Sequence, residues 1–180
     1  MIHIKEKYNK EVLPKLQQEL GIKNKFAIPR IEKVSLNIGL GRSLNDPKFT
    51  EVATKTLLAI TGQKPVERKA KKSIAAFKIR EGMSVGLSVT LRGERMYNFL
   101  DKFVNISLPR VRDFRGLENK SVDKQGNLNI GIKEHVVFPE IESEDIEKIH
   151  GLEVCISTTD KDAKSGHKLF EYLGFPFKKQ

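Results

Sequence analysis

Hydrophobic residues alternate with small or polar residues in four stretches of the chain, which begin at Ile31, Ser84, Leu128 and Leu152. Successive side chains of a β-strand point to opposite faces of a sheet, so each stretch predicts a strand with one buried face. A shorter and highly charged strand is expected over residues 66–69. The pattern therefore predicts about five strands.

Helical periodicity separates these strands. Hydrophobic residues recur every three or four positions in segments that begin near Ile4, Asp46, Gly93 and Asp162. An aspartate followed by proline is typical of a helix start, as at Asp46, and Gly62 is typical of a helix end. Pro14 interrupts the first segment, so we expect a kink or a restart of the helix there.

These elements predict an α+β fold. An antiparallel or mixed sheet of about five strands would bury its apolar side chains against helices on one face and leave the other face open. A chain of 180 residues can bury one sizeable core. We therefore expect a single domain over residues 1–180.

The open face would carry mostly small or uncharged polar side chains, namely those of Lys33, Ser35, Asn37, Gly86, Ser88, Thr90 and Ser157. Any half-solvated sheet has polar alternates, which would explain the alternation by itself. An ordinary solvated face, however, is rich in long charged side chains, whereas this face is small, polar and flanked by basic segments. That composition favours an open polar face that binds RNA.

Positive charge is concentrated in residues 64–80, where seven basic residues and one acid account for +6 of the net charge of +10. Such a density repels itself unless a polyanion neutralises it. The strand that begins at Ser84 places this segment inside a domain, as a basic loop over residues 69–83. Phe77 lies among the cations, where it could stack on a nucleotide or fold back into the core. The sequence favours neither alternative.

Residues 134–153 reverse the charge, with seven acids and a single lysine. Phosphate groups would be repelled by this acidic segment. A subunit of a ribonucleoprotein must meet basic proteins as well as RNA, and an acidic surface suits such a protein partner.

Catalytic and metal-binding patterns are weak in this sequence. One cysteine and four scattered histidines predict no disulfide, no metal site and no cofactor. Asp160, Asp162, Ser165 and His167 lie close together, but the start of a helix explains them equally well. We therefore expect neither an enzyme nor a small-molecule substrate.

Two classes of function fit the remaining features. No stretch is typical of a signal peptide or a membrane span, so we expect a cytoplasmic protein without a membrane partner. A free-standing RNA-binding or chaperone protein would show the basic loop. An architectural subunit of a ribonucleoprotein would show the acidic segment as well, which favours this second class.

Seven motifs follow one another along the chain: PRIEKVSLNIGLG (29–41), TGQKP (61–65), KAKKSIAAFKIREG (69–82), VTLRGERMYNF (89–99), PRVRDFRGL (109–117), VVFPEI (136–141) and GFPF (174–177). In this order they resemble the universal L5 family of bacterial large-subunit ribosomal proteins. The resemblance runs from end to end at similar length, and several long motifs in order are far more specific than one short pattern.

This resemblance implies a structural constituent of the large ribosomal subunit. Such a protein binds 5S rRNA and anchors it in the central protuberance, among the large-subunit rRNA. It contacts tRNA in the peptidyl site and forms an intersubunit bridge to small-subunit ribosomal protein thirteen.

The resemblance also implies roles for individual residues. Binding of 5S rRNA is implied for Lys33, Asn37, Gln63, Lys64, Thr90 and Arg92. The segment that reaches tRNA matches Lys72, Ser73, Ala76, Phe77, Lys78 and Arg80. The contact with the small subunit is implied for Glu134, Glu142, Glu144, Asp145 and Glu147.

Overall fold

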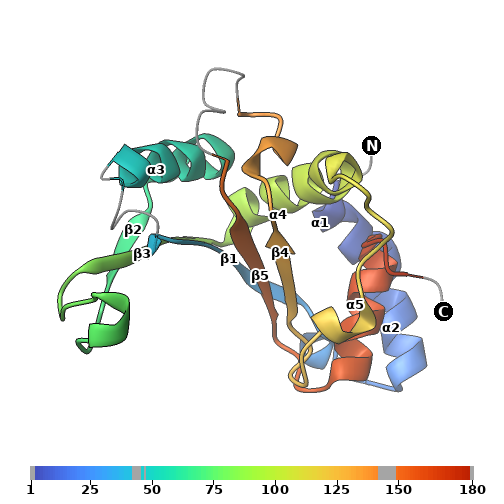
Figure 1. The fold of residues 1–180 in the computed structure, drawn as a ribbon. Coiled ribbons are helices and arrows are strands. Elements are labelled where there is room, and N and C mark those ends of the chain that lie inside the picture. The colour runs from blue at the N-terminus through green and yellow to red at the C-terminus, as the bar shows by residue number, and fades with distance from the viewer. Residues whose placement is uncertain (1–2, 42–45, 47, 142–148, 179–180) are drawn as a thin grey trace. The chain divides into compact units, whose positions relative to one another are not determined.

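The computed structural model describes residues 3–41, 46, 48–141 and 149–178 (Figure 1). The chain divides into two compact units. The first comprises residues 1–34, 91–130 and 155–180, and the second comprises residues 35–90 and 131–154. None of the described helices is both long and apolar enough to cross a membrane. The expectation of one domain over residues 1–180 stays a prediction.

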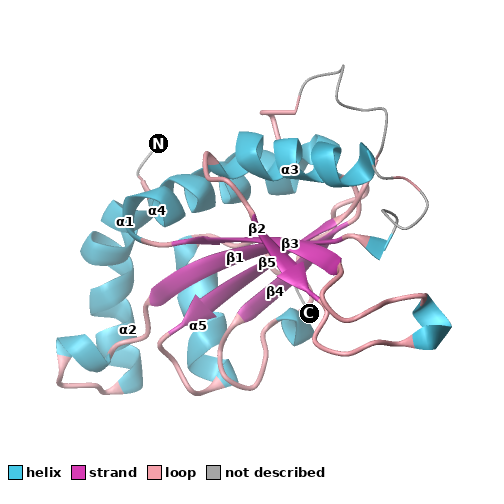
Figure 2. Ribbon diagram, turned by 90° about the vertical axis from the view of Figure 1, so that its left-hand side faces the viewer, coloured by secondary structure: helices cyan, strands magenta, loops and turns pink. Residues whose placement is uncertain are grey.

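Five strands form a sheet in the order β2-β3-β1-β5-β4 (Figure 2). Their bounds are Ile31–Gly39 (β1), Val66–Lys69 (β2), Ser84–Leu91 (β3), Leu128–Ile132 (β4) and Leu152–Thr158 (β5). Four of them begin where the alternation of hydrophobic and polar residues predicts a strand, and β2 coincides with the short charged strand expected over residues 66–69. The structure thus confirms the α+β class.

Side-chain burial follows the same alternation. In β1, Val34, Leu36 and Ile38 are buried, and the residues between them are half-buried. In β4 and β5, every second residue is buried and its neighbours are half-buried or exposed. In these three strands the apolar sides therefore contribute to the core, while the polar sides remain at least partly accessible to solvent.

The N-terminal helical segment changes its winding just before Pro14. It consists of α1 (Ile4–Lys7), a π-helical turn (Tyr8–Val12) and α2 (Leu13–Leu20). Proline cannot donate a backbone hydrogen bond, and a wider π turn is one way for a helix to absorb it. Pro14 lies in the first turn of α2, as expected of a restart, and Gly21 ends that helix with a φ of 63°.

In the first unit, the N-terminal segment is joined to α4 (Gly93–Lys102) and to α5 (Ala163–Leu173). The backbone N–H of Ile4 donates to Asp101 Oδ1 at 2.8 Å, at the end of α4. Lys7 Nζ donates to the carbonyl oxygen of Leu173 at 3.1 Å, at the end of α5. These bonds fix the start of the chain against both helices.

In the second unit, α3 (Lys48–Thr61) lies along one side of the strands (Figure 2). Asp46 Oδ1 accepts a hydrogen bond from the N–H of Lys48 at 3.1 Å, which confirms the expected cap. The buried stripe of this helix also matches the sequence pattern and consists of Phe49, Ala53, Thr56, Leu57 and Ile60.

Two histidines that are far apart in the sequence stack in the core of the second unit. The ring centroids of His135 and His150 lie 4.1 Å apart, and both side chains are buried. Phe49 packs edge-on against His150, with ring centroids 5.4 Å apart. The two histidines thus join the two ends of the acidic segment to each other and to α3.

Candidate nucleic-acid interface

The basic loop extends the hairpin formed by β2 and β3. The two strands are antiparallel, with Arg68 opposite Gly86, and their register shifts after Arg68. Beyond the strands, the N–H of Ala70 donates to Met83 O at 2.8 Å. Further out, Ile74 and Ile79 exchange two backbone hydrogen bonds of 2.9 and 3.1 Å. The loop is therefore a hydrogen-bonded arm, which we call the hairpin arm (residues 69–83).

The tip of the hairpin arm presents its side chains to solvent. A 3-10 turn spans Ala75–Phe77, and the N–H of Glu81 donates to Ser73 Oγ at 2.9 Å. The side chain of Phe77 is 66% exposed, which excludes the alternative in which it folds back into the core. The residues to which the resemblance assigns tRNA binding all lie in this arm, and none of them is buried: Lys72, Ser73, Ala76, Phe77, Lys78 and Arg80.

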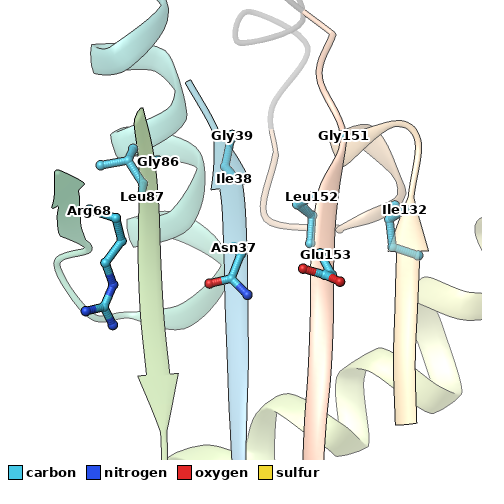
Figure 3. Close-up of a pocket in the computed structure, with 10 residues that line it drawn as sticks. All are labelled: Asn37, Ile38, Gly39, Arg68, Gly86, Leu87, Ile132, Gly151, Leu152 and Glu153. Carbon is cyan, nitrogen blue, oxygen red and sulfur yellow. The ribbon is translucent and has the colours of Figure 1, made fainter. Parts of the chain in front are cut away.

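A shallow hollow of about 480 Å³ opens on the polar side of the strands in the second unit (Figure 3). Three glycines line it, Gly39, Gly86 and Gly151. Three polar side chains also line it and come from different strands, namely Arg68 of β2, Asn37 of β1 and Glu153 of β5. Glycines among the lining residues, bordered by hydrogen-bonding groups, allow close approach of a flat polar ligand such as a nucleobase.

The glycines contribute to the hollow in different ways. A Cβ atom added at Gly86 would lie 3.2 Å from the carbonyl oxygen of Ile38, so this position is tightly packed. A Cβ atom added at Gly39 would meet no atom within 4 Å. The missing side chain at Gly39 therefore leaves space for a ligand rather than for the protein's own backbone.

Arg68 is held in place on the polar side of the strands. Its Nε donates to Ser88 Oγ at 2.7 Å, and Ser88 is buried although it belongs to the polar side. This bond orients the guanidinium and leaves its terminal N–H groups to bind a partner. A planar guanidinium suits a phosphate group, because it can donate two parallel hydrogen bonds.

Of the six residues expected to bind 5S rRNA, only Asn37 lines the hollow. Lys33, Gln63 and Thr90 are half-buried, whereas Lys64 and Arg92 are exposed. Lys33 and Arg92 belong to the first unit, and the other four belong to the second. The role of all six in RNA binding stays a prediction.

Two polar residues of the hollow are absent from the expected set. Arg68 stood out in the sequence only as one of seven basic residues, and Glu153 only as the last acid of the acidic segment. Alternation along β5 already places Glu153 on the same side as Ser157. Its proximity to Asn37 could not be read from the sequence, because it depends on β5 being the neighbour of β1.

The acidic segment is described only in part. Glu134 is exposed, in agreement with a surface role. The other residues expected to contact the small subunit, Glu142, Glu144, Asp145 and Glu147, lie outside the described residues. The contact with the small subunit therefore stays a prediction for all five.

Local structural contacts occupy the residues that we considered for catalysis. Asp160 Oδ1 accepts from the N–H of Lys161 at 2.8 Å, and Ser165 Oγ donates to Asp162 O at 3.2 Å. His167 Nε2 lies 3.1 Å from Asn119 Oδ1. In the described part of the chain, no group of three or more His, Cys, Asp and Glu side chains could hold a metal ion.

Comparison with known proteins identifies the family. The family model described as ribosomal protein L5 matches residues 24–80, and the model for the C-terminal part of the same ribosomal family matches residues 84–177. The chain belongs to the ribosomal protein L5 family. The large ribosomal subunit protein uL5 of Carboxydothermus hydrogenoformans is 50% identical over 177 residues, which cover 98% of this chain and 99% of the relative. That of Desulforapulum autotrophicum is 52% identical over 178 residues, which cover 99% of each chain.

Membership of the L5 family decides between the classes of function. Proteins of this family are structural and non-enzymatic, which confirms that the chain is no enzyme. As an L5 protein, the chain is a structural constituent of the large ribosomal subunit and a partner of ribosomal RNA. Its place is the cytoplasmic ribosome, as expected.

Proposed function

We propose that this L5 protein binds 5S rRNA through the polar side of its strands and anchors it in the central protuberance. The observation that carries the proposal is the glycine-lined hollow bordered by Asn37 and Arg68. RNA bases in loops and bulges can be read when they lie unstacked against a protein surface that offers hydrogen bonds. Gln63, Lys64, Thr90, Lys33 and Arg92 would add contacts around this site.

Affinity and selectivity would come from different parts of the second unit. The exposed cations of the hairpin arm attract phosphates whatever the sequence of the RNA, and this attraction weakens as salt rises. Hydrogen bonds from Asn37 and Arg68 require particular groups at particular places. Selectivity should therefore survive at salt concentrations that abolish nonspecific binding.

The tip of the hairpin arm would contact tRNA in the peptidyl site. Phe77 is exposed, and Lys72, Lys78 and Arg80 add positive charge to the same arm. An aromatic ring stacked on a base contributes about 1–3 kcal/mol, and neighbouring cations would bind the phosphates. The bridge to the basic small-subunit protein thirteen would be made by Glu134, Glu142, Glu144, Asp145 and Glu147.

The test is a titration of the purified protein with 5S rRNA and with an unrelated structured RNA of equal length, each across a salt series. We expect the two affinities to converge at low salt and a preference for 5S rRNA to persist at high salt. Equal affinities for the two RNAs that fall together as salt rises would contradict the proposal and indicate a basic protein whose hairpin arm binds RNA nonspecifically.

A charge variant measures the contribution of the hairpin arm in the same titration. Replacement of Lys69, Lys71 and Lys72 by Gln removes three exposed cations. If each binds one phosphate, the slope of log affinity against log salt should fall by about 2, since each phosphate contributes about 0.7 for a single strand. The matched control replaces Lys5, Lys161 and Lys164, which are exposed in the first unit, and should keep most of the slope. Equal effects of the two variants would show that only net charge matters.

A further inference from the structure

Glu153 is an acid on a surface that the proposed function assigns to RNA. It is exposed and lines the same hollow as Asn37 and Arg68 (Figure 3). Carboxylates repel phosphates, so an acid at this place would oppose binding if it met only the RNA backbone. Its presence calls for a contact with a different part of the nucleotide.

The arrangement of the strands separates Glu153 from the cation of the hollow. β5 is the neighbour of β1, whereas β2 lies three strands away from β5. Strands are about 4.8 Å apart, so the backbone at Glu153 lies roughly 5 Å sideways from that at Asn37 and about 14 Å from that at Arg68. Arg68 donates instead to Ser88. Within the described part of the chain, no side chain donates a hydrogen bond or forms an ion pair with the Glu153 carboxylate.

We infer that Glu153 reads the Watson–Crick edge of an unpaired guanine that enters the hollow beside Asn37. An ionised carboxylate only accepts hydrogen bonds, and it has two oxygens side by side. Guanine presents two adjacent donors on that edge, N1–H and the N2 amino group, which match these oxygens. Adenine, cytosine and uracil each place an acceptor there, which would face the carboxylate without a proton between them.

The same geometry assigns complementary roles across the hollow. The base would lie over the glycine-lined surface at Gly39, where no side chain intervenes. Arg68, held by Ser88, would bind a phosphate of the same or the next nucleotide on the opposite side. The backbones that carry the acid and the cation are about 14 Å apart by strand spacing, which exceeds the screening length of about 8 Å at physiological salt, so we assign each charge to a different group of the RNA.

This inference rests on the proposed function and predicts an effect of opposite sign to simple repulsion. The substitution Glu153→Gln removes the negative charge and one acceptor while keeping the shape of the side chain. If Glu153 only repelled phosphates, binding of 5S rRNA would become tighter. If it accepts two hydrogen bonds from guanine, we expect binding to weaken by about tenfold or more, because a donor loses its acceptor.

The experiment compares wild type, Glu153→Gln and the control Glu51→Gln, an exposed acid on α3, in titrations with 5S rRNA. Thermal unfolding shows whether all three fold alike.

Kethoxal, which modifies N1 and N2 of unpaired guanine, then identifies guanines that each protein protects. We expect wild type and control to protect one guanine that Glu153→Gln leaves reactive. Inosine at that position, which lacks the N2 amino group, should weaken wild type and leave Glu153→Gln unchanged.

The possible outcomes separate this inference from the function on which it rests. Wild-type preference for 5S rRNA together with unchanged or tighter binding by Glu153→Gln would overturn the inference alone. The same holds if the two proteins protect identical guanines. Loss of any preference in the wild type itself would overturn the proposed function, and the role of Glu153 with it.

Discussion

A larger side chain at Gly39 should raise the stability of the protein and weaken its binding to RNA. Gly39 is the last residue of β1 and lines the hollow, and an added Cβ would meet no protein atom within 4 Å. Its backbone is not in the left-handed region, so an ordinary residue fits there. We therefore expect the substitution Gly39→Val to fold normally while its side chain occupies the space in which a base would lie.

The two effects have opposite signs. Replacing a strand glycine limits the unfolded chain and should raise the free energy of unfolding by up to about 1 kcal/mol. For a chain of this size, that corresponds to an increase of about 2–4 °C in Tm. A base displaced from the hollow loses its hydrogen bonds to Asn37 and its neighbours, worth about 2 kcal/mol for two bonds. Affinity for 5S rRNA should then fall by about 30-fold.

The assay combines thermal unfolding with titration of 5S rRNA at high salt, where the attraction of the hairpin arm is weak. The control is Gly131→Val, a strand glycine with equally open surroundings that does not line the hollow. We expect it to change stability in the same way and affinity much less. A stable Gly39→Val protein that keeps its full affinity would refute the role of the hollow.

Two further substitutions test how the structure holds its polar groups. Ser88→Ala removes the acceptor of Arg68 Nε; we expect a loss of about 1 kcal/mol in urea unfolding and weaker RNA binding with an unchanged salt slope, because the cation remains. A reduced slope would show that Ser88 does more than orient Arg68. Burial raises the pKa of Asp123, but hydrogen bonds from Asn127 and Gln125 outweigh it and lower the pKa below its usual value. Since the folded state binds the proton of Asp123 less tightly than the unfolded state, the ionised carboxylate stabilises the fold at neutral pH, and this stabilisation is lost as the pH falls through the folded pKa. The substitution Asp123→Ala should therefore lower the free energy of unfolding by about 1 kcal/mol at pH 7 and by little in acid. An equal loss at both pH values would contradict this role of Asp123.

Local features of the fold were predictable because short-range physics determines them. Four of the five strands begin where alternation predicts them, since one-sided burial requires alternating hydrophobic and polar residues, and the exposed strand β2 also begins at its expected residue. The cap at Asp46 and the stripe of α3 follow from residues within one helix. Even the irregularity around Pro14 has a cause in the sequence, although the π turn that precedes it could not be specified beforehand.

Features that depend on strand order or on distant segments could not be predicted. The stacking of His135 on His150 joins residues that seemed scattered along the chain. The exposure of Phe77 depends on where the hairpin arm points, and composition left both alternatives equal. The hollow needs β2, β3, β1 and β5 in that order, which explains why Asn37 was expected there while Arg68 and Glu153 were not.

In the second unit, one pair of strands, β2 and β3, carries both the cationic hairpin arm and part of the hollow. The hairpin arm carries exposed cations and is tied by backbone hydrogen bonds at Ala70 and at Ile74, so its charges cannot drift independently of β2 and β3. The same two strands hold Arg68 and Gly86 at the hollow. Long-range attraction alone would bind any RNA, and the hollow alone would attract none from a distance. Under the proposed function, an RNA attracted to the arm would therefore reach the hollow in a restricted orientation, and hydrogen bonds to Asn37, Arg68 and Glu153 would then determine whether it stays bound.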